Sequence, residues 1–291
     1  MPSRNLTQPT FFRKEPVRAS EEYRRTALAG FLRTRRARID PDPCWPVVDA
    51  GTPRRVPGLR REELAWAAGV STEYYTKLEQ GRAAHPSASV VSSLSEVLQL
   101  SELESRYIQA LATPGPEQGA EEDTATVTHA EHILRGLGNQ LRDPVMLHVL
   151  TEDLTIRGVA PATAGILFPD GAPDPGHGFD LSLLTYIFTD PQSRQVYVDW
   201  SDKAREVVGL THLALARSIP TPQLLEALRT AWDNSSAFRY LWSRYEPYEK
   251  AYGSWRLQVE GRGIVVCNYT TFQVPSSRNV SLVVYTEAET G

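Results

Sequence analysis

The chain has 291 residues, of which 41% are hydrophobic and 23% charged, so it is long enough for two domains with separate cores and too apolar for a disordered chain. No apolar run approaches the ~20 residues of a membrane helix, and the N-terminus lacks a signal-like apolar segment, so we expect a cytoplasmic protein with no membrane partner. The net charge of −4 divides into 17 − 13 = +4 for residues 1–112 and 14 − 22 = −8 for the remainder, so only the N-terminal part suits a polyanionic partner.

The N-terminal end is predicted to be a mobile tail over residues 1–18, because these residues are polar and lack a clear period. Ser20 is a good N-cap and is followed by acidic residues, so it is predicted to begin a helix. The apolar residues of this helix keep helical spacing and are Leu28, Phe31 and Leu32. The helix should end before Pro41, and the five prolines of residues 40–57 predict a loop.

Residues 58–82 are predicted to form two short helices joined by a tight turn. The first helix has a slim inward face of Leu64, Ala65 and Ala68, which lets a second helix cross it closely. Gly69 supplies the positive φ of the turn, Val70 fills the corner and Ser71 can cap the second helix. Tyr75 and Leu78 should pack inward, and Gly81 should end this helix. The pattern is typical of a helix-turn-helix unit; a simple helical hairpin would need the alanines, the Gly-Val-Ser corner and the basic flanks to coincide by chance.

The second of these helices is predicted to read DNA. Its outer face carries side chains with lengths that suit base edges or nearby phosphates, and basic residues on both sides are placed to grip phosphates. The predicted DNA-binding residues are Arg60, Arg61, Ser71, Thr72, Glu73, Thr76, Lys77 and Arg82. The expected partner is a double-stranded DNA operator. A homodimer is expected as well, because one recognition helix reads only a few base pairs.

Two more helices should complete the first domain, which we place at residues 19–112. Ser87 and Ser101 are their predicted N-caps. The first domain is therefore predicted to be all-helical, with about five helices. Residues 113–129 have the Pro, Gly and acidic content of a linker.

The second domain, residues 130–291, is predicted to be an α+β domain. It should open with a helix near 130–142, followed by a hairpin of Val145–Leu150 and Leu154–Val159 and a long loop at 169–178. The further elements are helices near 180–189, 192–217, 221–231 and 235–246, and strands at Trp255–Val259, Gly263–Phe272 and Ser281–Tyr285. Five strands with inserted helices predict a small antiparallel sheet covered on one face by helices.

Residues 28–112 resemble the XRE-type helix-turn-helix regulators called MmyB-like. The resemblance rests on three sequence segments. They are Leu-Ala-Gly-Phe-Leu-Arg-Thr-Arg-Arg at 28–36, Arg-Arg-Val-Pro-Gly-Leu-Arg-Arg-Glu-Glu-Leu-Ala at 54–65 and Gly-Val-Ser-Thr-Glu-Tyr-Tyr-Thr-Lys-Leu-Glu-Gln-Gly-Arg at 69–82. The resemblance continues through the sequence segments at 188–194, 197–200, 238–242 and 269–275. The resemblance implies a PAS-like fold for the second domain, with a pocket that has been associated with a fatty acid, and thus a ligand-responsive transcription factor.

Three polar pairs found in many relatives are missing from this chain. The positions concerned are Leu181 and Ser182, Thr211 and His212, and Val259 and Glu260. If those pairs hold an acidic headgroup, the resemblance implies that the ligand of this protein is less acidic or more aromatic. A pocket needs a mostly apolar lining, and the candidate ligand-binding residues are Tyr186, Tyr197, Trp200, His212, Phe238, Trp242 and Trp255. For any single one of them, the alternative of an ordinary core aromatic is favoured.

No enzyme motif is recognisable: there is no Gly-X-Ser-X-Gly elbow, phosphate-cradling glycine loop or His-Glu-X-X-His helix. We therefore expect no catalytic residue and no cofactor. His129 and His132 are three residues apart and could share a metal ion, but a solvated linker face is favoured and no metal site is predicted.

Two functions stay open for the second domain. It binds a small apolar or aromatic effector that modulates operator binding, or it is a protein-interaction module, because the aromatic content of residues 186–255 suits either.

Overall fold

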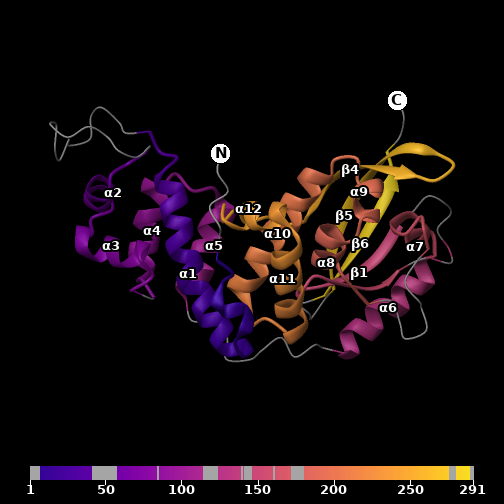
Figure 1. The fold of residues 1–291 in the computed structure, drawn as a ribbon, viewed down its shortest axis with the longest axis horizontal. Helices are drawn as coiled ribbons and strands as arrows, with labels where there is room; N and C mark the ends of the chain where they lie inside the picture. The colour runs from indigo at the N-terminus through magenta and orange to yellow at the C-terminus, as the bar shows by residue number, and fades with distance from the viewer. Residues whose placement is uncertain are drawn as a thin grey trace.

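The computed structural model of the protein describes residues 7–40, 58–83, 85–113, 124–138, 140, 146–159, 161–171, 180–274 and 280–288. Most of the predicted loop at 40–57, the residues 114–123 of the predicted linker and most of the predicted loop at 169–178 lie outside this range. Figure 1 shows a helical N-terminal part beside a second part built on a sheet.

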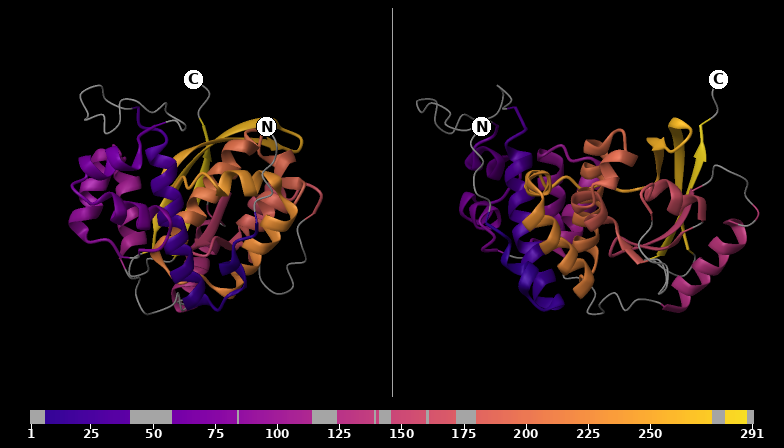
Figure 2. Two further views of the ribbon diagram at one scale, coloured as in Figure 1. Left: turned by 60° about the vertical axis from the view of Figure 1, so that its left-hand side comes forward. Right: turned by 45° about the vertical axis from the view of Figure 1, so that its right-hand side comes forward.

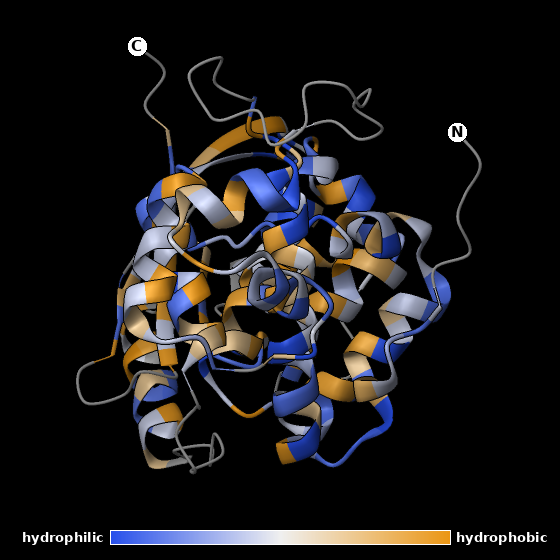
Figure 3. Cartoon of the chain, turned by 90° about the vertical axis from the view of Figure 1, so that its left-hand side faces the viewer, coloured by the Kyte–Doolittle hydropathy of each residue, from blue (hydrophilic) through white to orange (hydrophobic). Residues whose placement is uncertain are grey.

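The N-terminal part is all-helical, as predicted. Its elements are η1 (Thr10–Arg13), α1 (Pro16–Arg36), α2 (Arg61–Ala67), α3 (Thr72–Glu79), α4 (Ala88–Val97) and α5 (Glu102–Ala112). Ser87 and Ser101 cap α4 and α5 through their side chains, which confirms both predicted N-caps. The helices show alternating hydrophilic and hydrophobic bands (Figure 3), and the apolar residues that share one face form the core.

The prediction of a mobile tail over residues 1–18 is wrong for residues 10–18. Thr10–Arg13 form a 3-10 turn in which Phe11 and Phe12 are buried, and α1 begins at Pro16. Proline suits the first turn of a helix because its missing N–H has no partner there in any case. Ser20, the predicted N-cap, is instead buried inside α1. The polar character of residues 1–18 gave no sign of this burial, because Trp232 and Trp242, which pack against the two phenylalanines, come from the second domain.

The second domain is an α+β domain with a PAS-like antiparallel sheet. Its helices are α6 (Thr124–Gly138), α7 (Pro161–Leu167), α8 (Leu183–Thr189), α9 (Gln192–Val196), α10 (Trp200–Arg217), α11 (Pro222–Asn234) and α12 (Ser236–Trp242). Its strands are β1 (Met146–Thr151), β2 (Thr155–Val159), β3 (Asp180–Ser182), β4 (Tyr252–Val259), β5 (Gly263–Gln273) and β6 (Val280–Glu287). The strand order is β3-β2-β1-β6-β5-β4, and every neighbouring pair is antiparallel.

Helices cover both faces of the sheet at β1, so the prediction of one covered face is wrong. Side chains alternate between the faces of a strand, and all of β1 is buried. Leu147 and Val149 pack with Val127 and Leu134 of α6, whereas Met146 belongs to the core on the opposite face. Helix α6 begins at Thr124, earlier than predicted, and Figure 2 shows it on the outer side of the sheet.

The predicted helix at 192–217 is two helices, α9 and α10. Between them Tyr197 forms a bridge with Leu257 of β4, and the N–H of Val198 donates to the carbonyl of Arg256 over 3.1 Å. Pairing with a strand requires extended backbone, so the helix cannot continue through these residues. Strand β3 and helix α7 were not predicted. Among the described residues, no helix is long and apolar enough to cross a membrane.

Candidate functional sites

The turn between α2 and α3 has the predicted helix-turn-helix geometry. Gly69 has a φ of 67° and Gly81 a φ of 66°, both in the region that favours glycine. The Ser71 hydroxyl accepts a hydrogen bond from the N–H of Tyr74 over 3.2 Å and caps α3. Figure 1 shows α2 and α3 at the end of the molecule farthest from the sheet, where the second domain does not cover them.

The outer face of α3 brings the predicted DNA-binding residues together. Thr72, Glu73 and Lys77 are exposed and Thr76 is half-buried. Glu73 and Lys77 form an ion pair of 2.7 Å along the helix. This pair holds the Lys77 ammonium over the outer face of α3, one turn from Glu73.

The three basic residues around α3 differ in their surroundings. Arg82 is exposed just after the helix. Arg60 is at the N-cap of α2, where its N–H donates to the Glu63 carboxylate over 2.7 Å. Arg61 is partly exposed, but its Nε donates to Glu79 over 2.7 Å. Because this contact already engages the guanidinium, Arg61 has fewer donors left for a phosphate than the sequence suggested.

Glu79 is the centre of a buried ionic cluster that joins α1, α2 and α3. Its carboxylate accepts from Arg36 Nε at 2.5 Å, from Arg61 Nε at 2.7 Å and from the Tyr75 hydroxyl at 2.8 Å. Burial by itself raises the pKa of Glu79, but the hydrogen bonds from Arg36 and Arg61 outweigh it and lower the pKa. The carboxylate is therefore ionised, and it holds the recognition helix against the rest of the first domain.

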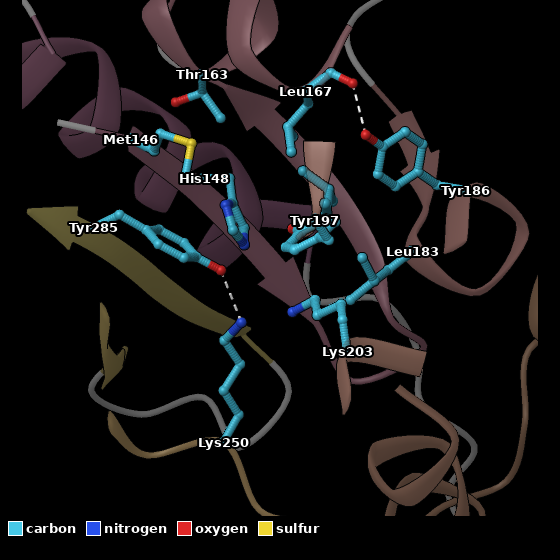
Figure 4. A pocket seen from close by; sticks show the side chains of 11 residues that line it. Met146, His148, Thr163, Leu167, Leu183, Tyr186, Tyr197, Lys203, Lys250 and Tyr285 are labelled. Carbon is cyan, nitrogen blue, oxygen red and sulfur yellow. Dashed lines mark hydrogen bonds between the residues drawn. The ribbon is translucent and has the colours of Figure 1, made fainter. Parts of the chain in front are cut away.

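The second domain contains an enclosed inner cavity between the sheet and α7, α8 and α10 (Figure 4). Its free volume is about 10 Å³, which is room for about one water molecule. The lining residues are Met146, His148, Ile156, Thr163, Leu167, Leu183, Tyr186, Tyr197, Lys203, Lys250 and Tyr285.

A larger and more open outer pocket, of about 160 Å³, lies on the other side of Lys250. It is lined by Leu150, Thr151, Glu152, Leu154, Leu210, Leu213, Ala214, Arg217, Glu249, Lys250, Thr271, Gln273 and Ser281. A cavity of about 150 Å³ can hold a benzene-sized molecule. The outer pocket therefore has the volume for a small ligand that the inner cavity lacks.

Two buried lysines line the inner cavity, and one of them, Lys250, also lines the outer pocket. The side chains of Lys203 and Lys250 are only 1% and 3% exposed. Both share one oxygen of Glu206, at 2.5 Å from Lys203 Nζ and 3.4 Å from Lys250 Nζ. Lys250 also donates to the Tyr285 hydroxyl over 2.9 Å. The cluster thus holds two cations against one carboxylate.

The surroundings shift the pKa values of Lys203, Glu206 and the neighbouring His148. Burial lowers the pKa of Lys203, and Glu206 opposes this by favouring the ammonium. Burial raises the pKa of Glu206, but the two lysines outweigh it, so its pKa is lowered and it is ionised. Burial, and then the two lysines, lower the pKa of His148 well below its usual value, so this imidazole is neutral.

Of the seven predicted ligand-binding residues, Tyr186 and Tyr197 line the inner cavity. Trp200 donates from its indole nitrogen to the Ile187 carbonyl and packs against Phe188. Trp255 stacks edge-on against Tyr197 outside the inner lining. Spacing along the chain does not distinguish aromatics that line a pocket from aromatics of the core, so the ligand-binding roles of Trp200 and Trp255 stay predictions.

The other three predicted residues, His212, Phe238 and Trp242, lie where the two domains meet. Phe11 of η1 stacks on Trp242 with ring centroids 6.2 Å apart. The His212 Nδ1 atom lies 2.7 Å from the Tyr23 hydroxyl, and its Nε2 donates to the Trp242 carbonyl over 3.1 Å. Burial lowers the pKa of His212 to about 3, so the ring is neutral. These three residues are buried in the main hydrophobic core or packed within it, and their ligand-binding role stays a prediction.

His148, Lys203 and Lys250 line the inner cavity but were not among the predicted site residues. Lys203 and Glu206 are three residues apart and lie on the inward face of α10 with Val207. The sequence signal for a buried charged site was the presence of these two charged residues within the apolar stripe of the helix. It was hidden because the predicted helix began eight residues too early. His148 and Lys250 gave no local signal, since a strand and a connecting segment place them.

The segment 243–250, which connects α12 to β4, links the cavities to the first domain. The Tyr245 carbonyl accepts from Arg35 Nη2 over 2.9 Å, and Glu246 pairs with Arg38 at 2.5 Å. Glu249, which lines the outer pocket, pairs with Arg106 of α5 at 2.6 Å. The segment ends at Lys250, which lines both cavities.

Two glycines admit the 243–250 segment between the domains. A Cβ on Gly30 of α1 would overlap the Tyr245 ring. A Cβ on Gly209 of α10 would lie 2.8 Å from the Glu246 carbonyl oxygen and 2.5 Å from the Tyr248 Cβ. Close contact with both helices therefore depends on the absence of a side chain at these two positions.

Comparison with known families covers both parts of the chain. Residues 27–107 match the model of a helix-turn-helix domain. Residues 143–290, just over half of the chain, match the model described as MmyB-like transcription regulator ligand binding domain. No curated protein matches the chain. Both matched models describe parts of regulators, and among the described residues no group of three or more His, Cys, Asp or Glu is placed to hold a metal ion.

Proposed function

The chain belongs to the MmyB-like transcription regulators, and we propose that a small effector bound at its outer pocket and inner cavity changes the affinity of its helix-turn-helix unit for an operator. That it is a DNA-binding regulator with a ligand-binding domain follows from the two family matches. The effector, its place and its effect on DNA binding are the proposal.

The observation that carries the proposal is the 243–250 segment. At one end Lys250 lines both cavities, and Glu249 lines the outer pocket. Along its length the segment binds α1 through Arg35 and Arg38, and α5 through Arg106. An effector that moves Lys250 or Glu249 therefore acts on α1, which packs against α3 and pairs with it through Arg36 and Glu79. A ligand shifts the equilibrium between two conformations only by the difference between its affinities for them. An effector that binds the two conformations unequally can change operator affinity if they differ in the contacts of the 243–250 segment.

On the DNA side, we infer that the outer face of α3 enters the major groove. Thr76 and Lys77 are then placed for base edges, and Arg60 and Arg82 for phosphates. Replacing Thr76 and Lys77 with alanine should weaken specific operator binding about tenfold or more, measured by fluorescence anisotropy on an operator selected from random duplexes. Unchanged affinity would place the reading face elsewhere. Affinity should also fall steeply with added salt.

Coupling is tested with two probe pairs of matched shape, benzoate with benzamide and hexanoate with hexanamide. A probe that binds the protein by calorimetry should change operator affinity by about 5- to 150-fold at saturation. Gly30→Ala should reduce this change, because its methyl group displaces Tyr245. Gly136→Ala on α6, where a Cβ meets nothing within 4 Å, is the matched control. If probes bind the cavities and operator affinity stays the same, the proposed regulation is wrong.

A second candidate function, protein interaction, is supported by the outer face of β4 and β5. Tyr252 is 81% exposed and Phe272 54% exposed, and Ile264 and Val266 face the same way. We propose that this face, which α6 leaves open, pairs two copies of the chain. Sedimentation velocity should show a dimer, and Ile264→Glu should convert it to a monomer. A monomeric wild type would remove this candidate.

A further inference from the structure

We propose that the inner cavity of the effector-free protein binds one halide ion, held between Lys203, Lys250 and His148. The inference goes beyond the proposed function, because it concerns an inorganic ion that is bound when no effector is present. The ion lies between α10, which carries Lys203, and the end of the 243–250 segment, which carries Lys250. An effector group that enters the inner cavity has to displace it.

The side chains around the inner cavity carry one excess positive charge. Lys203 and Lys250 share a single carboxylate, that of Glu206, and all three side chains are at most 3% exposed. Among the described residues that line the inner cavity there is no carboxylate. A buried charge without a counter-charge is costly. An anion in this cavity therefore stabilises the folded protein, and a cation is excluded.

Aromatic rings surround the two lysines but do not neutralise them. The Nζ atom of Lys203 lies 5.3 Å from the ring centroid of Tyr197 and 5.2 Å from that of Trp255. The Nζ atom of Lys250 lies 4.5 Å from the ring centroid of Tyr269. An aromatic face attracts a cation through its quadrupole and has no net charge. The excess charge is therefore left for a ligand to balance.

The inner cavity also offers hydrogen-bond donors besides the two ammonium groups. The imidazole of His148 is neutral, because burial and the two lysines lower its pKa, and it carries one N–H. Its buried Nδ1 atom has no hydrogen-bond partner within the part of the chain that the structure describes. The Tyr285 hydroxyl accepts from Lys250 over 2.9 Å, which leaves its own proton to donate. Figure 4 shows His148, Tyr285 and the two lysines around the same space.

The size and charge of the inner cavity select a halide among the anions. The free volume of about 10 Å³ is room for about one water molecule. A halide is a single atom, whereas carboxylates, sulfate and phosphate each have several heavy atoms. A monovalent ion brings the two lysines and Glu206 to neutrality, but a divalent ion would leave a buried negative charge. A water molecule would fit the cavity and leave the positive charge unbalanced.

Urea unfolding of the full-length protein tests this, with sodium chloride replacing sodium methanesulfonate at constant ionic strength. The screening of surface charges then stays equal, and methanesulfonate is too large for the cavity. Above the dissociation constant, each tenfold increase in chloride should raise the folding equilibrium constant about tenfold, as expected for one ion bound to the folded protein. Bromide should act in the same way. Equal stability in chloride and methanesulfonate overturns the inference.

A lysine variant tests the place of the ion. Lys203→Met should abolish the chloride dependence, because Lys250 and Glu206 are then a neutral pair. Arg205→Met, which removes an exposed pair with Asp202 on the same helix, is the matched control and should keep the dependence. A chloride dependence that survives in Lys203→Met would place the ion elsewhere and overturn the inference.

Crystals of the wild-type protein grown in sodium bromide cover the case in which Lys203→Met does not fold. Anomalous scattering should show a bromide ion in the inner cavity, in contact with Lys203 and Lys250. Bromide found only at surface arginines overturns the inference, whatever the effect of chloride on stability.

Discussion

The first and second domains each bury one glutamate between two cations, yet the two clusters differ in how fully they are satisfied. Glu79 uses both carboxylate oxygens, which accept from two arginines and a tyrosine. Glu206 shares one oxygen between two lysines, and its Oε2 has no hydrogen-bond partner among the described residues. The first cluster lies against packed helices, and the second borders a cavity.

The difference shows how similar charges serve two purposes. A guanidinium is a planar fork that fixes its carboxylate in one geometry, whereas an ammonium on a flexible stem can turn to a new partner. Full satisfaction makes the Glu79 cluster a structural brace for α3. Incomplete satisfaction leaves the Glu206 cluster with one acceptor, Oε2, that no described residue fills.

The largest effect on stability is expected for Glu79→Gln, which tests whether the Glu79 cluster supports α3. Glu79→Gln should lower the free energy of unfolding by about 3–5 kcal/mol, because Arg36 stays buried without its counter-charge. Urea unfolding at pH 7.5 measures this, with the exposed Glu62→Gln as the control. The folded-state pKa of Glu79 is lowered, so its contribution is present above the unfolded pKa and is lost as pH falls through the folded value. A Glu79→Gln protein as stable as the control would show that the cluster is not a brace.

The second largest effect is expected for His212, which lies where the two domains meet and is uncharged when folded. His212 has a pKa of about 3 when folded and an ordinary pKa when unfolded, so acid stabilises only the unfolded state. Between pH 7.5 and pH 5 this should cost about 2 kcal/mol of stability. His212→Gln should lose that part of the pH dependence, measured by urea unfolding at both pH values. Identical pH dependence in the two proteins would mean that His212 is charged, and the junction would then be a third ionic cluster.

A smaller effect on stability is expected when one tyrosine hydroxyl is removed from each cluster. Tyr75→Phe and Tyr285→Phe each remove one hydroxyl from a charged partner, which should cost about 1.5 kcal/mol of stability. Only Tyr285→Phe should also alter the dependence of stability on chloride, measured by urea unfolding, since only that hydroxyl borders the inner cavity. If both variants changed the chloride dependence equally, the two clusters would not be separate in function.

The smallest expected effect on stability is at the surface of α3. Lys77→Ala removes an exposed pair with Glu73 and should leave the urea midpoint unchanged. Operator affinity should nevertheless fall. A clear loss of stability would mean that Lys77 supports the fold and would weaken its assignment to DNA reading.

The sequence predicted the first domain well because its signals are local. Gly69, Ser71 and the Leu64 face act within a few residues, and the structure reproduces each of them. The α+β class of the second domain and its first hairpin also followed from local alternation.

The errors share one physical cause, which is dependence on distant partners. Phe11 is buried by Trp242, and Tyr197 is held extended by Leu257, each over a long separation in the chain. The cavity lysines were missed for the same reason. Lys203 and Lys250 meet only when α10 and the 243–250 segment have been placed side by side.

The docking of η1 affects how this protein could be recombined with its relatives. Hybrid regulators are usually made by joining the reading part of one parent to the sensing part of another at the linker. Here such a cut would leave Trp232 and Trp242 facing the phenylalanines of a different parent, because Phe11 and Phe12 complete their packing. A hybrid that is to stay regulated must therefore inherit η1 and α1 together with α10–α12, so the unit of exchange is the interface and not the domain.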